Sequence, residues 1–426
     1  MRKTVLFLVA AAFIAVPIVA WASVMSSLFG QLPFSYLALQ VTAFIAFTLF
    51  FFQFVLSSRI RIFEKDIGLD RLFVAHRFVG QVGLGFALLH FIFVGVYELG
   101  FLGQLSLNTG KFLGVIGLLG MIVVGAVAST YKKLNLRYET WKNIHRAAYF
   151  IYPVLFAHVL MLGSTVSASP VIAAYVYVII GLYALVVLAK TIKLIRVRRN
   201  PFTVAAVEQL THDTWNLRFD GPKPSFKPGQ FMLISLRRDG QTSESHPYTI
   251  SSSPTAKQLS ITPKAIGDFS ASVKDTKVGD QAFIEAPYGA FTYDRAPTNK
   301  LVFIAGGIGI TPFLSMLRYM RETGGNQMVT LLWGNKTEAD MAFREEIDAM
   351  EEAMPNLHVV HILSHQKDWE GETGFITGDK ITALVPDYAD RSFFICGPPV
   401  MREKVVPELK ELGIGRSRIF FEIFAL

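Results

Sequence analysis

The sequence predicts a multidomain membrane protein: a six-helix transmembrane bundle, then an antiparallel β-barrel domain, then an α/β domain with a parallel sheet. Three observations carry this prediction. Of the 426 residues, 52% are hydrophobic and only 17% are charged, which is too apolar for an ordinary soluble protein. Residues 1–200 hold 18 Lys+Arg against 5 acidic residues, whereas residues 201–426 hold 23 against 28. Near Phe202 the long apolar runs give way to short alternating strands.

Composition also excludes several classes of protein. The positive mean hydropathy is inconsistent with a disordered chain. A single cysteine excludes a disulfide scaffold and an iron–sulfur cluster held by thiolates. The net charge of +8 separates into +13 for the first half and −5 for the second, so we expect no nucleic-acid partner.

Six apolar runs in the first half are each long enough to cross a bilayer core, which takes ~20 helical residues. The lipid bilayer is therefore a predicted partner. The start, Arg2-Lys3 before an apolar run, also resembles a signal peptide. We expect this segment to be retained, because the topology below works better with it. The predicted spans are residues 4–25, 34–56, 73–97, 112–130, 147–165 and 170–192.

Charges in the connections predict the orientation of the bundle. Basic residues gather in segments 57–70 and 130–146 and after the sixth span, whereas segments 23–33 and 163–170 carry no charge. Basic loops stay in the cytoplasm, so the N-terminus and the second half of the chain are expected there, with only Lys111 outside. The cytoplasmic basic residues include Arg59, Arg61, Lys65, Lys132, Lys133, Arg137, Lys142, Arg146, Lys190, Lys193, Arg196, Arg198 and Arg199.

The membrane half contains four histidines, two in the third predicted span and two in the fifth. His76 and His90 are 14 residues apart, so an ideal helix brings them to within about 40° of one face and roughly 21 Å apart along its axis. His145 and His158 are 13 apart, which leaves them about 140° out of phase in an ideal helix. However, Pro153 lies between them, and proline kinks helices.

A distorted fifth helix would place His145 beside His76 and His158 beside His90. Imidazole is a common axial ligand of haem iron, so this spacing predicts two bis-histidine haem sites, one near each side of the membrane. The alternative is that the histidines bond helix backbones or line a proton path. Ionisable residues inside a bilayer are costly, which favours a functional role.

The second half is predicted to contain two domains. From Phe202, short alternating strands separated by turns predict an antiparallel barrel of about 100 residues. From Lys300, a strand, a glycine-rich turn, a helix and a second strand predict a βαβ unit and a parallel sheet. The expected domains are residues 1–196, 197–297 and 298–426. The predicted barrel strands are residues 203–208, 213–218, 230–236, 259–263 and 281–285.

Four motifs in this half indicate chemistry. The His-Pro-Tyr-Thr motif at 246–249 ends a strand, and segment 264–270 puts a glycine and a hydroxyl at a predicted helix N-terminus, which favours a pyrophosphate or a plain capping turn. The glycine-rich turn 305–312 lets backbone N–H groups approach a diphosphate. Segment 394–401 follows a hydrophobic strand, and a buried inert thiol is the default interpretation of Cys396.

In this order and spacing, the four motifs resemble the ferredoxin–NADP reductase superfamily. With the histidine-bearing half in front, the chain from about residue 35 onward resembles the NADPH oxidase / ferric reductase family, most closely its compact bacterial members. The resemblance implies two haem b groups, FAD and NADPH or NADH as cofactors. It implies that the haem ligands are His76, His90, His145 and His158. The implied FAD contacts are His246, Pro247, Tyr248, Thr249, Lys264, Gly267, Phe269 and Ser270.

The same resemblance implies the nicotinamide site. Lys336 is placed where a 2′-phosphate would be read, which favours NADPH, and a solvated lysine is the alternative. The catalytic residues would be Cys396, Glu422 and Phe424, the last covering the flavin until nicotinamide displaces it; here Ala425 and Leu426 follow it. The remaining implied nucleotide contacts are Gly306, Gly307, Gly309, Thr311, Pro312, Gly397 and Pro398.

The function that the resemblance implies is electron transfer across a bacterial cytoplasmic membrane, from cytoplasmic NAD(P)H through FAD and two haems to molecular oxygen, giving superoxide. The alternative acceptor is a ferric chelate. It is favoured by two departures from oxygen-reducing members: Val94 stands where some have a second histidine, and residues 34–56 contain no arginine. Another alternative is a haem-free membrane anchor carrying a flavin reductase, and a further one is a proton-conducting or redox-sensing module. We expect no obligate activator.

Overall fold

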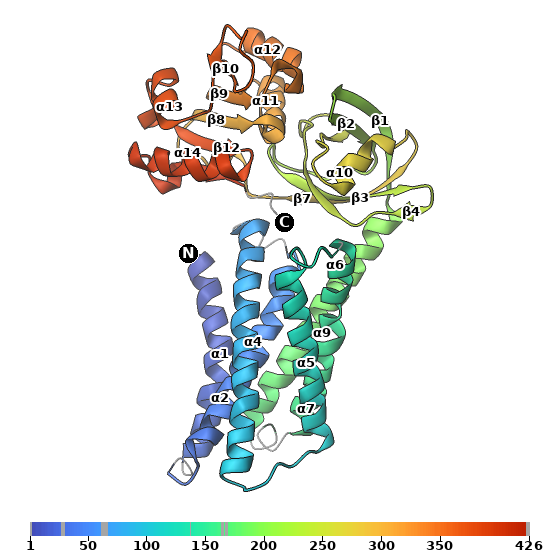
Figure 1. Ribbon diagram of the computed structural model, residues 1–426, viewed down its shortest axis with the longest axis vertical. Coiled ribbons are helices and arrows are strands. Elements are labelled where there is room, and N and C mark those ends of the chain that lie inside the picture. The colour runs from blue at the N-terminus through green and yellow to red at the C-terminus, as the bar shows by residue number, and fades with distance from the viewer. Residues whose placement is uncertain are drawn as a thin grey trace. The chain divides into compact units, whose positions relative to one another are not determined.

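The computed structural model describes residues 2–26, 30–60, 67–136, 138–162, 166 and 169–422, with the backbone alone for residues 2–10 and Asp70. The chain divides into two compact units, Met1–Lys193 and Leu194–Leu426. The first is a helical bundle, and the second contains two β-sheets with their helices (Figure 1). The residues that carried predictions but lie outside the described ones are Arg61, Lys65, Arg137, Phe424, Ala425 and Leu426.

Long apolar helices form the first unit. Five helical segments are long and apolar enough to cross a membrane, and they coincide with the second to sixth predicted spans. The helices are α1 (Arg2–Met25), α2 (Phe34–Ser57), α4 (Leu69–Gly100), α5 (Thr109–Thr130), α6 (Tyr138–Arg146), α7 (Ala148–Met161) and α9 (Pro170–Arg199).

The first predicted span is the one that the structure does not establish. Residues 4–25 do form helix α1, but only Ala11–Met25 counts as an apolar helix among the fully described residues, and this length is short of a bilayer crossing. The fully described residues thus contain five candidate spans instead of six, and the span at residues 4–25 stays a prediction.

The fifth predicted span is broken between its two histidines. Helix α6 ends at Arg146 and α7 begins at Ala148, so His145 and His158 lie on separate helical segments. Pro153 lies inside α7 and has no N–H to donate to the carbonyl of Tyr149. The hydroxyl of Tyr183 on α9 donates to that carbonyl at 2.6 Å instead, so the backbone group is satisfied without water.

Glycines on α5 let α7 approach closely. A Cβ atom at Gly114 would lie 2.6 Å from ring atoms of His158, and one at Gly117 would lie 2.3 Å from Leu155. Membrane helices gain little hydrophobic energy by associating, so close packing through small residues is what holds such a pair together. The α5–α7 contact therefore fixes where the His158 ring can lie.

An antiparallel sheet forms the first part of the second unit. Its strands run in the order β4-β3-β7-β1-β2-β6, with β5 paired to β3, and β1, β2, β3, β6 and β7 each overlap one of the five predicted barrel strands. The elements are β1 (Phe202–Thr211), β2 (Thr214–Asp220), β3 (Phe231–Arg238), β4 (Gln241–Thr242), β5 (His246–Thr249), β6 (Leu259–Ile261), α10 (Asp268–Ala271) and β7 (Gln281–Tyr288).

A parallel sheet in the order β11-β10-β9-β8-β12-β13 forms the second part. Side chains of β8 alternate between two cores: Phe303 packs with α11 and α12, and Ile304 packs with α13 and α14. The elements are β8 (Lys300–Gly306), α11 (Thr311–Thr323), β9 (Met328–Asn335), α12 (Arg344–Ala353), β10 (Leu357–Leu363), β11 (Glu372–Thr373), α13 (Gly378–Leu384), β12 (Ser392–Cys396), α14 (Pro399–Glu411) and β13 (Ile419–Phe421).

The glycine contact with His158 can be tested directly. Gly114→Ala places a methyl group against the imidazole, so we expect the free energy of unfolding to fall by about 1–3 kcal/mol, as for other overpacked sites. The matched control is Gly181→Ala on α9, where the new methyl group meets nothing within 4 Å. Thermal unfolding in detergent measures both, and equal shifts for the two variants would contradict the close α5–α7 contact.

Candidate functional site

The first histidine pair joins α4 to α6. The ring centroids of His76 and His145 lie 5.8 Å apart, with the ring planes inclined at 64°. Nδ1 of His76 lies 3.2 Å from the main-chain carbonyl oxygen of Gln53 on α2. His145 stacks on Trp141 at 5.7 Å, and its Nδ1 is buried without a hydrogen-bond partner in the described part of the chain.

The second pair joins α4 to α7. The ring centroids of His90 and His158 lie 6.3 Å apart, inclined at 75°. Nδ1 of His90 lies 2.8 Å from the carbonyl oxygen of Leu39 on α2, and Nδ1 of His158 lies 2.8 Å from that of Gly110 on α5. Both rings of the fifth span face α4, although an ideal helix would leave them about 140° apart; the turn at Ala147 and Pro153 both lie between them.

These hydrogen bonds determine which ring nitrogen is free. A carbonyl oxygen can only accept, so Nδ1 of His90 and His158 carries the proton and Nε2 keeps its lone pair. Nδ1 of His76 lies beside both the main-chain carbonyl and the side-chain amide of Gln53. A metal bonded at about 2.0 Å to one nitrogen of each ring would separate the ring centroids by about 6 Å, close to both observed spacings. The histidines therefore do bond helix backbones, and His90 and His158 keep a nitrogen for a metal as well.

Each pair offers two protein ligands and no more. In the described residues there is no cluster of three or more His, Cys, Asp or Glu side chains that could hold a metal. Two imidazoles suit an iron whose remaining ligands come from a planar prosthetic group, since haem needs only axial ligands from the protein. An ordinary zinc site with four protein ligands is inconsistent with this arrangement.

Lys190 on α9 belongs near the first pair, and sequence reasoning assigned it only to the basic end of the bundle. Its Nζ donates to the carbonyl oxygen of Ser57 at 3.3 Å and contacts the hydroxyl of Tyr149. Ser57 lies one turn after Gln53 on α2, and Tyr149 lies four residues after His145. The only signal in the sequence was a lysine at the end of an apolar span, which also fits an interfacial anchor.

The predicted flavin residues gather from two segments of the antiparallel sheet domain. His246 on β5 stacks on Phe269 of α10 at 4.0 Å, and Tyr248 lies 6.0 Å from the same ring. Burial raises the pKa of the Tyr248 hydroxyl above its usual range, so the ring is neutral. Thr249 ends the strand and is buried, while Pro247 pairs with Leu233 of β3.

The polar groups of segment 264–270 bond mostly to other residues of the protein. Helix α10 is only four residues long, and the Ser270 hydroxyl receives the N–H groups of Ile266 and Gly267, both at 3.0 Å. Lys264 forms ion pairs with Asp213 at 3.3 Å and Asp340 at 3.6 Å. The capping alternative therefore describes the geometry, and the pyrophosphate contact stays a prediction.

The glycine-rich turn packs against the cysteine motif. In register, Ala305 of β8 faces Cys396 of β12, so both motifs leave the sheet at the same edge. A Cβ atom at Gly309 would lie 2.2 Å from the carbonyl oxygen of Cys396. One at Gly306 would lie 2.8 Å from the ring of Pro398, so neither glycine has room for a side chain.

This edge is also the topological switch point of the sheet. The chain runs from β8 outward to β9 and β10, and returns on the other side of β8 as β12, so the crevice between β8 and β12 is where such sheets bind nucleotides. Gly307 has a φ of +52°, and Thr311 and Pro312 begin α11 directly after the turn. Gly397 packs on Gly306 across the same crevice.

The predicted catalytic residues are only partly described. Cys396 is a buried free thiol, and burial raises its pKa, with the nearby Glu422 carboxylate raising it further. The thiol is therefore protonated and is not an activated nucleophile. Phe424 lies outside the described residues. Lys336 is exposed after β9, and the amide of the preceding Asn335 is buried, with neither of its polar atoms bonded in the described part of the chain.

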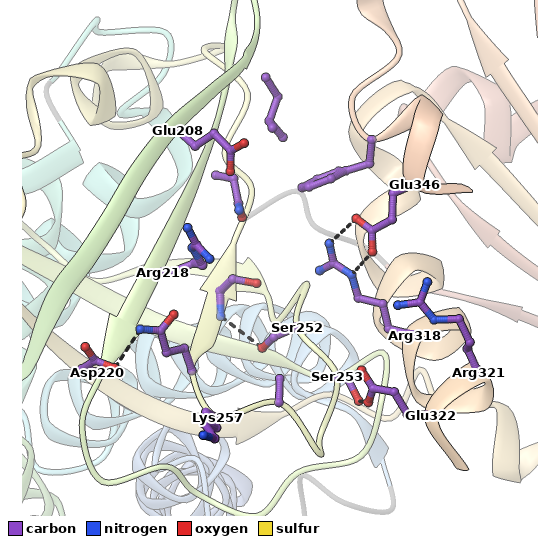
Figure 2. A pocket seen from close by; sticks show the side chains of 16 residues that line it. Glu208, Arg218, Asp220, Ser252, Ser253, Lys257, Arg318, Arg321, Glu322 and Glu346 are labelled. Carbon is purple, nitrogen blue, oxygen red and sulfur yellow. Dashed lines mark hydrogen bonds and ion pairs between the residues drawn. The ribbon is translucent and has the colours of Figure 1, made fainter. Parts of the chain in front are cut away.

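A cleft of 610 Å³ lies elsewhere in this unit, and none of the predicted site residues line it. Figure 2 shows it between strands of the antiparallel sheet and helix α11. Its four basic and four acidic side chains balance in charge. Arg318 donates twice to Glu346, at 2.7 and 2.6 Å, and once to the carbonyl oxygen of Ser251 at 2.7 Å. The bond from Arg318 to Ser251 crosses this cleft and joins the two sheet domains.

Comparison with known families identifies all three parts of the chain. Residues 42–156 match the "Ferric reductase like transmembrane component", residues 199–292 match an "FAD-binding domain", and residues 303–406 match the "Oxidoreductase NAD-binding domain". The chain therefore carries a ferric-reductase-like transmembrane component, followed by an FAD-binding domain and an NAD-binding oxidoreductase domain.

Individual relatives match about half of the chain. The glycine betaine monooxygenase reductase subunit of Chromohalobacter salexigens is 31% identical over 51% of this chain and 62% of its own length. The ferredoxin reductase component of 3-ketosteroid-9-alpha-monooxygenase from Rhodococcus rhodochrous is 32% identical over 52% and 64%. The chain thus spans less than two thirds of these relatives. A flavohemoglobin structure from Malassezia yamatoensis shares only fold: TM-score 0.50, 20% identity, covering 95% of this chain and 99% of that one.

The crevice between β8 and β12 predicts a sharp effect of a small substitution. Gly309→Ala drives a methyl group into the Cys396 carbonyl, so we expect NAD(P)H-driven flavin reduction to fall at least about tenfold through misplacement of the turn. Gly415→Ala is the control in the same domain, because its nearest non-neighbouring atom is 3.9 Å away. Stopped-flow flavin absorbance measures both, and a normal rate in Gly309→Ala would place nucleotide binding elsewhere.

Proposed function

We propose that this protein passes electrons from cytoplasmic NAD(P)H, through FAD and two bis-histidine b-type haems, to molecular oxygen across a bacterial cytoplasmic membrane, producing superoxide. The observation that carries the proposal is the pairing of His76 with His145 and of His90 with His158. In the balanced reaction each NAD(P)H gives two electrons and one proton, and two oxygen molecules accept one electron each.

Haem fits the histidine pairs on three grounds. The ring spacings match two axial nitrogens on one iron. The Nδ1 hydrogen bonds to backbone carbonyls orient the rings of His90 and His158 and raise their basicity, as is usual for metal-bound imidazole. The two pairs share helix α4, where their histidines are 14 residues apart, so the chain holds one site near each end of the bundle.

The protein's own contribution is placement and insulation. FAD and haem would supply the conversion of a two-electron donor into single-electron steps. His76 with His145, and His90 with His158, would hold the two haems, and such pairs would leave no open metal position for the acceptor. No side chain is therefore required to act as an acid or a base in the transfer.

The acceptor side of the bundle supports an uncharged acceptor. In the sequence, segments 26–33, 98–111 and 162–170 are predicted on the side opposite the basic loops, and their only charged residues are Glu98 and Lys111. These two pair with each other. The surface thus offers no net charge to attract an anionic chelate, whereas oxygen needs none. This supports oxygen as the acceptor.

Ferric-chelate reduction is the second candidate, because specific residues favour it. Val94 and the arginine-free second span leave the oxygen pocket of some relatives incomplete. The same electron path would serve either acceptor, so the choice rests on the last step alone.

NADPH is the proposed donor, and the cytoplasm is the proposed location of the flavin and nucleotide domains. Lys336 is exposed at the C-terminal end of β9, one strand from the glycine-rich turn, where a 2′-phosphate would find a positive charge. The positions of the basic residues around the bundle support the orientation.

The haem assignment has a spectroscopic test. Purified protein reduced with dithionite should show paired-haem absorbance, with two haems per chain. His90→Ala should lose about half of the haem by removing one axial ligand, while NAD(P)H still reduces the flavin. His212→Ala is the control, since that ring is 67% exposed in the other unit. No haem absorbance in the unsubstituted protein would leave the haem-free flavin reductase as the interpretation.

The acceptor has a separate test. NADPH-driven reduction of cytochrome c should be largely abolished by superoxide dismutase, because the dismutase removes the carrier that the proposal invokes. An oxygen trace should show consumption in the same sample. Reduction that is insensitive to dismutase, together with rapid reduction of ferric citrate, would favour the second candidate.

A further inference from the structure

A buried ion pair closes the outer connection between α4 and α5. Glu98 lies near the C-terminal end of α4 and Lys111 lies in the first turn of α5, and their charged groups are in contact. The carboxylate side chain is only 7% exposed and the lysine side chain is 21% exposed. A buried charge is costly unless it is both paired and hydrogen-bonded, so the question is what this pair holds in place.

Ser106, in the loop between the two helices, satisfies both charges. Its N–H donates to Oε2 of Glu98 at 3.3 Å and its hydroxyl donates to Oε1 at 3.1 Å. Nζ of Lys111 donates to the Ser106 carbonyl oxygen at 2.9 Å. The loop is therefore tied to both helices through one residue. We call Glu98, Ser106 and Lys111 the outer latch.

The outer latch holds the turn of α5 that contacts the second histidine pair. Asn108 caps α5, its Oδ1 accepting from the N–H of Lys111 at 2.9 Å. The residue before Lys111 is Gly110, whose carbonyl oxygen accepts from Nδ1 of His158. A Cβ atom at Gly110 would lie 2.9 Å from Leu162, so the first turn of α5 is closely packed against the end of α7.

We propose that the outer latch is a positioning device for the His90–His158 pair. By fixing the first turn of α5, it keeps the Gly110 carbonyl on Nδ1 of His158 and so keeps Nε2 directed at His90. Removing one charge leaves the other buried without a partner, and that charge would open the loop to reach water. The haem part of this inference rests on the proposed function; the link between the latch and His158 does not.

The test is a charge-removal cycle in the full-length protein. Glu98→Gln and Lys111→Met should each weaken retention of the outer haem about tenfold, as loss of a supporting contact does at other metal sites. The double variant, which leaves no unpaired charge, should recover most of that loss. The inner haem and flavin reduction by NADPH should be unchanged in all three. Lys133→Met, an exposed lysine beyond the other end of α5, is the control.

The outcomes separate this inference from the proposed function. Low-spin haem signals in electron paramagnetic resonance and a redox titration report each haem by itself, so selective loss of the outer signal supports the latch. Equal loss of both signals, or no loss, overturns it. If the unsubstituted protein binds no haem, the proposed function fails. The latch then stands or falls on whether Glu98→Gln and His158→Ala shift the unfolding temperature non-additively.

Discussion

A hydrogen bond from a histidine Nδ1 to a main-chain carbonyl of a neighbouring helix is the interaction on which the membrane unit depends. It occurs at His76, His90 and His158, and in each case the acceptor belongs to a helix other than the histidine's own. Inside a bilayer such a bond has no competing water, so it sets the ring orientation strongly. It also requires the helices to lie at a fixed separation, which glycines of α5 allow for α7 and which Gly80 and Gly83 of α4 allow for α2.

In the second unit, the two motifs are held in place by backbone contacts instead of side-chain hydrogen bonds. Parallel neighbours β8 and β12 release their motifs at one edge, and glycines at 306 and 309 let those motifs touch. The thiol of Cys396 is protonated there, so the crevice offers shape and backbone donors in place of a reactive group. Under the proposed function, both units would hold cofactors whose chemistry the side chains do not supply.

The apolar helices and the two sheet domains were predictable from hydrophobic periodicity and motif spacing. The five apolar segments and the two kinds of sheet follow from patterns that a few neighbouring residues specify. Three contacts between helices were not predictable, because they depend on the register between helices far apart in sequence. They are the carbonyl partners of the histidines, the bond of Lys190 to Ser57, and the contact of Gly114 with His158. The span at residues 4–25 and the role of Phe424 stay predictions, since they fall wholly or partly outside the fully described residues.

The helix assignment is interrupted at Ala147, so the two histidines of the fifth span belong to different helical segments. His145 belongs to α6, and His158 belongs to α7, whose backbone is held independently by Tyr183 and by the glycines of α5. A substitution in α7 can therefore alter the His90–His158 pair while leaving the contacts of His145 with His76 and Trp141 in place. Under the proposed function, small changes in this one helix would tune one of the two sites without rebuilding the other.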